Sequence, residues 1–127
     1  MSGQFYDYRR MNANNKSNVI GRRLREARKM AGIPQDRLGV MVGLDEHTAS
    51  ARISRYETGV HEPNFEMAGK LAAILGVPVV YFYCEDDRLA KLVLAWGKMS
   101  DDERELWGEI FMVNHDAKIF LRNLRIR

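Results

Sequence analysis

The sequence contains very little cysteine, and the single Cys84 excludes an internal disulfide framework. Such a chain is typical of the reducing cytoplasm, where we expect this cysteine to be a small buried hydrophobe. The three histidines, His47, His61 and His115, are too far apart to suggest a metal site. No apolar run approaches the roughly 18–20 residues that span a bilayer, and residues 1–18 lack the apolar centre of a signal peptide. The sequence therefore predicts a cytoplasmic protein that does not contact a membrane.

Sequence signs of catalysis are also missing. The sequence shows no nucleophile–base pair, no paired carboxylates and no phosphate-binding glycine loop. We therefore predict a protein that is not an enzyme and that needs no cofactor or metal. A length of 127 residues allows one ordinary domain with an appendage, and 46% hydrophobic with 29% charged residues is typical of a globular chain.

Charge is distributed unevenly although the net charge is only +3. Residues 1–60 contain 11 Lys and Arg against 6 Asp and Glu, whereas residues 61–127 contain 9 against 11. This asymmetry is what an anion-binding domain with a non-binding appendage would show, and two solvated surfaces of accidental sign would show it equally.

Apolar residues recur at helical spacing between short, glycine-containing connections, and no segment alternates convincingly with the period of a strand. We predict an all-α chain in which a flexible tail (1–18) precedes a five-helix domain (19–84). The domain's expected helices cover residues 19–31, 35–42, about 45–57 with Asp45 as N-cap, 65–75 with Phe65 on the buried face, and the short segment 79–83. Arg22 and Arg23 are expected on a solvated face near a helix start, where they could add phosphate contacts.

Residues 85–127 are predicted to form a C-terminal helical appendage. Three acidic residues, 85–87, suit a helix N-terminus, Gly97 is expected to end that helix, and Ser100 with Glu103 forms a capping box for the next. The following apolar residues are spaced 4, 3, 4, 3, 4, like a coiled-coil heptad, and we call them the seam: Leu106, Ile110, Val113, Ala117, Phe120 and Leu124. Weak helix formers at 114–116 are expected to interrupt it. The seam is the candidate homodimer contact, and packing back onto the first domain is the alternative.

The segment from Gly32 to Gly59 has the order of a helix-turn-helix, in which one helix braces another that lies in the DNA major groove. Its residues resemble the phage repressor/Cro-type, Xre-like family over about half the chain, residues 20–83. The resemblance depends on Arg28, on Ile53-Ser54-Arg55-Tyr56-Glu57-Thr58-Gly59 followed by Pro63, and on Leu71-Ala72 with Leu75-Gly76-Val77.

The resemblance implies a role in DNA binding for seven residues. It places Ser50, Ala51 and Arg55 at base-reading positions, Arg52 near a base edge or a phosphate, and Gln35 and Thr58 at phosphates, while the Thr48 methyl could touch a thymine. It also pairs Arg28 with Glu57 in a structural ion pair.

Two departures from the family pattern concern the DNA-binding helices. Pro34 stands where the family places a capping Ser or Thr. Four extra residues, 45–48, precede the recognition helix, and we expect them to lengthen it by one turn.

Taken together, the sequence predicts a sequence-specific transcriptional regulator, most simply a bacterial or phage repressor that binds a palindromic operator as a homodimer in the nucleoid. A controller of restriction–modification genes belongs to the same class. An antitoxin that neutralises a toxin partner through its C-terminal helices is the alternative from another class. A ligand-gated switch is a third, since about 43 C-terminal residues would need a dimer interface to enclose a pocket of ~300 Å³.

Overall fold

The computed structural model of the chain describes residues 18–125, so the tail predicted over 1–18 lies outside the described residues except for Asn18. The described part contains helices and no strand, which confirms the all-α prediction. Its elements in chain order are α2 (Val19–Ala31), α3 (Gln35–Met41), α4 (Ala49–Thr58), α5 (Phe65–Leu75), the 3₁₀ helix η1 (Val79–Tyr83), α6 (Asp87–Lys98) and α7 (Asp101–Arg125). None of these helices is long and apolar enough to cross a membrane.

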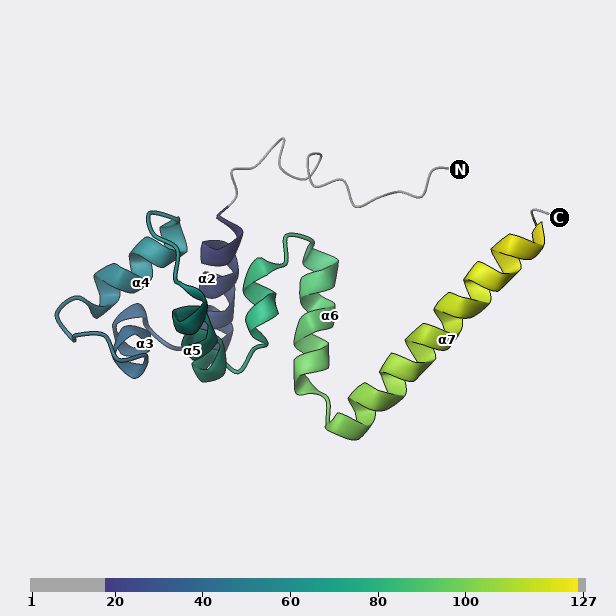
Figure 1. Cartoon of the computed structure of the whole chain (residues 1–127). Helices are drawn as coiled ribbons and strands as arrows, with labels where there is room; N and C mark the ends of the chain where they lie inside the picture. The colour runs from purple at the N-terminus through teal and green to yellow at the C-terminus, as the bar shows by residue number, and fades with distance from the viewer. Residues whose placement is uncertain (1–17, 126–127) are drawn as a thin grey trace. The chain divides into compact units, whose positions relative to one another are not determined.

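The chain divides into two compact units, Met1–Leu94 and Ala95–Arg127, with the boundary inside α6. The first unit holds α2 to η1, which gather around one another in Figure 1. The second unit holds α7, a single continuous helix.

One hydrophobic core joins the five elements of the first unit. Each element contributes one of the largest fully buried side chains: Leu24 from α2, Leu38 from α3, Ile53 from α4, Leu71 from α5 and Phe82 from η1. Burying a side chain of this size stabilises a fold by about 1.5–3 kcal/mol, so α4 is fixed by the same core that holds its neighbours.

Helix ends follow local sequence signals. Asn64 caps α5 by accepting a hydrogen bond from the Met67 N–H at 2.8 Å. Gly32 ends α2 with a φ of 68°, a left-handed conformation that glycine adopts without strain. The capping box of α7 is present, because Ser100 Oγ accepts from the Glu103 N–H at 3.2 Å and Glu103 accepts from the Ser100 N–H at 2.8 Å.

Several predictions about individual elements were wrong. The weak helix formers at 114–116 do not interrupt α7, because it continues through them from Asp101 to Arg125. Gly97 does not end α6, which continues to Lys98. Phe65 is 74% exposed rather than part of the buried face; it is the first residue of α5 and does not pack against the core.

The four extra residues before α4 do not lengthen it, so that prediction was also wrong. They form a turn, and α4 begins at Ala49 with Thr48 in the N-cap position. Asp45 organises the turn, since its carboxylate accepts from the His47 N–H at 2.8 Å and its carbonyl accepts from the Thr48 N–H at 3.1 Å. A side chain that bonds its own loop competes with helix formation, which explains why the helix starts later.

Candidate DNA-binding surface

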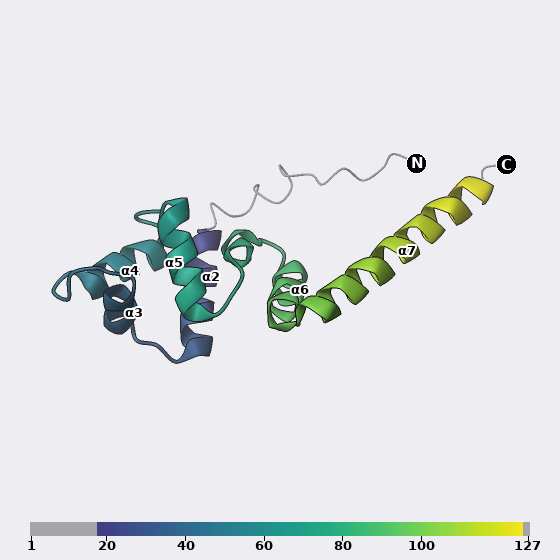
Figure 2. The ribbon, with the colours of Figure 1, turned by 60° about the horizontal axis from the view of Figure 1, so that its bottom comes forward.

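Helices α3 and α4 cross in close contact, and Gly39 of α3 makes this possible (Figure 2). A Cβ built on Gly39 would lie 2.6 Å from Ala49 Cβ and 2.9 Å from the Ala49 carbonyl oxygen. Because any larger residue would collide with the α4 backbone, Gly39 and Ala49 set the distance at which α3 braces α4.

Helix α4 has one buried face and one exposed face. Ala49, Ile53 and Tyr56 pack into the core at helical spacing. The opposite face carries five of the residues predicted to contact DNA, all exposed: Ser50, Ala51, Arg52, Arg55 and Thr58. The structure therefore brings these five side chains together on one short helix, with exposed Thr48 immediately before it.

A nearly buried ion pair ties α4 to the scaffold. The Glu57 side chain is 4% exposed, and its Oε1 accepts from Nε of Arg28, which is 13% exposed. Arg28 Nη2 lies 3.3 Å from the other carboxylate oxygen, and Arg28 Nη1 donates to the Ile33 carbonyl at 3.1 Å. The pairing implied by the family resemblance is present, and it links α2, the α2–α3 connection and α4.

Gln35 is predicted to reach a phosphate, and in this structure its side chain is held by two partners on α4. Its Nε2 donates to Glu57 Oε2 at 2.8 Å, and its Oε1 accepts from the Ser50 hydroxyl at 3.3 Å. The first residue of α3 thereby fixes the orientation of Ser50 at the start of α4. Pro34, in front of Gln35, makes no side-chain capping bond, as the sequence predicts.

Two arginines of α4 border a polar hollow that the sequence did not indicate. The hollow has a volume of about 380 Å³ and is lined by Arg52, Arg55, Tyr56, His61 and Glu62. Arg52 Nη2 donates to the Tyr56 hydroxyl at 3.3 Å, which orients its guanidinium. No local pattern could reveal this grouping, because the turn after α4 brings residues 61 and 62 back to its last turns: the His61 N–H donates to the Arg55 carbonyl at 3.2 Å.

The Thr58 hydroxyl donates to the Ser54 carbonyl at 2.9 Å, one turn earlier on α4. A phosphate oxygen is an acceptor, so this hydroxyl would have to rotate to bind one.

Asn18 is a structural contributor that the sequence analysis missed. Its carboxamide oxygen accepts from the Gly21 N–H at 3.0 Å and so caps α2, while its Nδ2 donates to the Glu57 carbonyl at 2.6 Å. The end of α4 is thus anchored to the start of α2. Asparagine before an apolar helix was the available signal for the cap, whereas its second partner is 39 residues away.

Comparison with known proteins agrees with this geometry. The family HTH_3, described as helix-turn-helix, matches residues 24–82. The crystal structure of the transcriptional regulator BswR is similar, with 39% sequence identity, a TM-score of 0.69 and coverage of 72% of this chain and 91% of that chain. A comparison with curated proteins finds no match. The chain belongs to the phage repressor/Cro-type helix-turn-helix family. In this helix-turn-helix protein, α3 is the bracing helix and α4 is the recognition helix.

One expectation about the helix-turn-helix unit needs correction. Arg23 is not on a solvated face but is 3% exposed. Its guanidinium donates to the Cys84 carbonyl at 2.8 Å, to Glu26 at 3.0 Å, to Asp87 at 2.8 Å and to the Glu85 carbonyl at 3.2 Å. Because Arg23 is buried and four of its five N–H donors are engaged in this way, it is not a phosphate contact.

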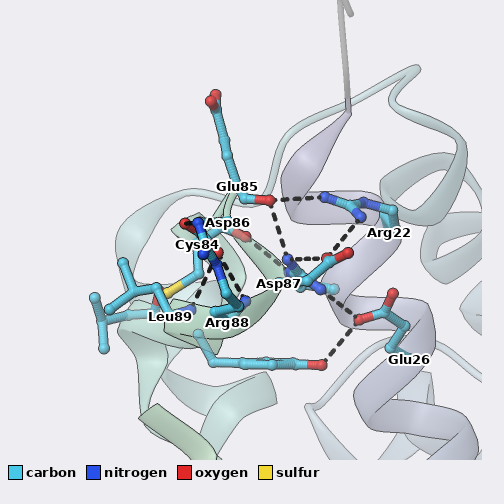
Figure 3. A network of polar contacts seen from close by, with 11 residues as sticks. Arg22, Glu26, Cys84, Glu85, Asp86, Asp87, Arg88 and Leu89 are labelled. Atoms are coloured by element: carbon cyan, nitrogen blue, oxygen red, sulfur yellow. Dashed lines mark hydrogen bonds and ion pairs between the residues drawn. The ribbon is translucent and has the colours of Figure 1, made fainter. Parts of the chain in front are cut away.

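The network around Arg23 joins α2 to the start of α6 (Figure 3). Arg22 donates to the same Asp87 oxygen at 3.2 Å, and the Tyr81 hydroxyl donates to Glu26 at 3.0 Å. Burial lowers the pKa of Arg23, but hydrogen bonds to Glu26 and Asp87 outweigh it and keep that pKa above its ordinary value. The Arg23 hydrogen bond lowers the pKa of Asp87, whereas burial and the bond to Glu26 raise the pKa of Tyr81 to about 12.

Cys84 is buried, as predicted, and its thiol donates to the Val80 carbonyl at 3.3 Å. Burial raises the pKa of this thiol, so the reactive thiolate form is suppressed. Among the described residues, no group of three or more His, Cys, Asp or Glu side chains is arranged to hold a metal ion.

Proposed function

We propose that this protein is a sequence-specific transcriptional regulator of the cytoplasm, a repressor that binds a palindromic operator as a homodimer. The observation that carries the proposal is the exposed face of α4, where Ser50, Ala51, Arg52 and Arg55 stand free of the core while Glu57 anchors the helix from behind. A recognition helix must be held in place by the protein on one face and leave its other face accessible to DNA.

Arg55 is the residue we expect to read a base, since an arginine can donate two parallel hydrogen bonds to guanine O6 and N7. Arg52, oriented by its bond to Tyr56, lies on the exposed face of α4, where its guanidinium can donate to a phosphate oxygen. Ala51 and the Thr48 methyl are apolar surfaces that fit a thymine methyl.

A homodimer is the natural form of such a regulator, because one recognition helix reads only a few base pairs. The seam on α7 supports the dimer, since its large side chains are 40–66% exposed. The antitoxin alternative calls for a tail that folds on a toxin, whereas α7 is a continuous helix in the chain alone, which favours the homodimer.

The first test is selection of binding sites from random duplex DNA by the purified full chain at about 150 mM salt. A palindrome with half-sites about 34 Å apart is the expected result. Recovery of no consensus, with binding that disappears as salt rises, would overturn sequence-specific regulation.

The second test compares Arg55→Ala with Lys70→Ala on the selected site and on unrelated DNA. Loss of a bidentate guanine contact is expected to weaken specific binding by about 1–3 kcal/mol, roughly 5- to 150-fold, with a smaller effect on unrelated DNA. Lys70→Ala removes the same charge from α5 and is expected to weaken both equally and little. Equal losses on both DNAs for Arg55→Ala would make Arg55 a phosphate contact.

A further inference from the structure

A second cavity lies away from the DNA-binding surface, and we call it the α2–α6 pocket. It has a volume of about 470 Å³ and is bounded by α2, by Tyr81 of η1 and by the part of α6 up to Leu94. All its lining residues precede Ala95, so the pocket belongs entirely to the first unit. Small molecules occupy pockets of about 300–1,000 Å³ in proteins. The first unit alone therefore offers such a volume, and no dimer interface is needed to form it.

The network around Arg23 closes one end of the pocket. The Arg23 guanidinium donates to Asp87 at 2.8 Å and so joins α2 to the first residue of α6. The other lining residues of the two helices lie further along each helix, within residues 26–30 of α2 and 90–94 of α6. A space that is closed at one end suits a compact molecule, whereas an amphipathic helix is bound in a longer groove that accommodates anchors over two turns.

The accessible wall of the pocket is mainly apolar, although charged residues line it. The Tyr81 hydroxyl and Arg23 Nη1 each donate to Glu26 Oε2 at 3.0 Å, so these polar groups are bound to one another. The rest of the apolar lining consists of Met30, Ala90 and Leu94. An apolar group could therefore be buried in the pocket without breaking a hydrogen bond, which is the condition for a favourable contact.

Two lysines give the pocket a positive charge. Lys29 of α2 and Lys91 of α6 both belong to the lining and are exposed. Among residues 18–125, neither lysine forms an ion pair. Together with Arg23 they add three positive charges to the lining, against one negative charge from Glu26. Because Glu26 is already bonded to Arg23, the two lysines remain available to attract an anion.

We propose that the α2–α6 pocket binds a small amphipathic acid, whose carboxylate pairs with Lys29 and Lys91 while its apolar body is buried between α2 and α6. The pocket shares no residue with α4, so this proposal does not depend on the proposed function. Most of the affinity comes from the apolar body, since each buried CH₂ group strengthens binding about fourfold. An exposed ion pair adds about two- to fivefold, which is enough to select an acid over a neutral molecule of the same shape.

Titration of the full chain with octanoate, followed by NMR of isotope-labelled methionine methyl groups, tests the proposal. Met30 and Met112 are equally exposed, at 60% and 59%, but Met30 lines the pocket whereas Met112 lies on α7. A saturable shift of the Met30 signal is expected, with Met112 unchanged; Met30→Leu assigns the signal. Equal shifts of both signals without saturation would mean adsorption to apolar surface and would overturn the proposal. No Met30 shift at several millimolar octanoate would also overturn it, as when another segment or a second copy fills the pocket.

Shortening the ligand tests whether its apolar body is buried. Hexanoate lacks two CH₂ groups of octanoate and is expected to bind about 15-fold more weakly. Equal affinity for the two acids would place the chain of the ligand in solvent and would overturn a buried apolar body.

Removing charge tests the role of the lysines. Lys29→Gln and Lys91→Gln are each expected to weaken octanoate binding about two- to fivefold and to leave the binding of neutral octanol unchanged. The matched control is Lys70→Gln, which removes the same charge from α5, outside the pocket, and is expected to change neither. Lysine variants that bind octanoate as tightly as the wild type would overturn the assignment of an acid.

Discussion

Removing the Glu57 carboxylate is the sharpest test of how the recognition helix is held. In Glu57→Ala, the Arg28 guanidinium keeps its bond to the Ile33 carbonyl but loses both contacts to the carboxylate, and Gln35 Nε2 loses its acceptor. Breaking a buried pair by removing one partner costs about 3–5 kcal/mol. Because Arg28 is still 13% exposed and retains one acceptor, we expect the lower end, about 3 kcal/mol of the free energy of unfolding.

Urea unfolding followed by far-ultraviolet circular dichroism measures this loss, with linear extrapolation to water. The matched control is Glu66→Ala, which removes an exposed carboxylate paired with Lys70 and is expected to change stability by less than about 1 kcal/mol. A Glu57→Ala variant no less stable than Glu66→Ala would refute the reasoning. DNA affinity, measured where the variant is still folded, is expected to fall as well, because Ser50 loses its support through Gln35.

Two further predictions concern packing and pH. Gly39→Ala is expected to destabilise the protein by about 1–3 kcal/mol and to weaken DNA binding, because its Cβ would lie 2.6 Å from Ala49 Cβ. The control is Gly69→Ala, whose Cβ meets nothing within 4 Å and which is expected to stabilise the protein by about 0.5–1 kcal/mol. Thermal unfolding of the two variants measures both changes. The raised pKa of Tyr81 means that its contribution to stability is complete below pH ~10 and is lost as pH rises toward 12, with a slope of about 1.4 kcal/mol per pH unit. The free energy of unfolding, measured by urea unfolding between pH 10 and 12, should therefore fall less steeply with pH in Tyr81→Phe than in the wild type. An unchanged slope would contradict the raised pKa of Tyr81.

Local signals explain why so much of the fold could be predicted from the sequence. Apolar spacing, capping residues and helix-ending glycines act within one or two turns, so α2, α3 and α5 were found with nearly correct bounds, and the start of α7 was found from its capping box. The same holds for the exposed face of α4, since the burial of Ile53 and Tyr56 places Ser50, Arg52 and Arg55 on the other side.

The errors arose where local signals compete. Aspartate is favoured both as a helix N-cap and in turns, and in this structure the Asp45 side chain stabilises a turn. Residues 114–116 are weak helix formers. In a 25-residue helix, however, the free-energy cost of three such residues is smaller than the gain from the hydrogen bonds that continue the helix.

The sequence by itself determined the all-α class and the helix-turn-helix order, because apolar spacing and helix-ending residues are local signals. The residues proposed to contact DNA came from the resemblance to a known family. Only the tertiary structure decided the role of Arg23, the second partner of Asn18 and the hollow beside Arg52. Each of these depends on groups that the fold brings from elsewhere in the chain, such as the Cys84 carbonyl, 61 residues from Arg23. The local sequence around an arginine is the same whether its guanidinium is hydrated or is surrounded by buried hydrogen-bond acceptors. Only the tertiary packing decides which of the two environments it has.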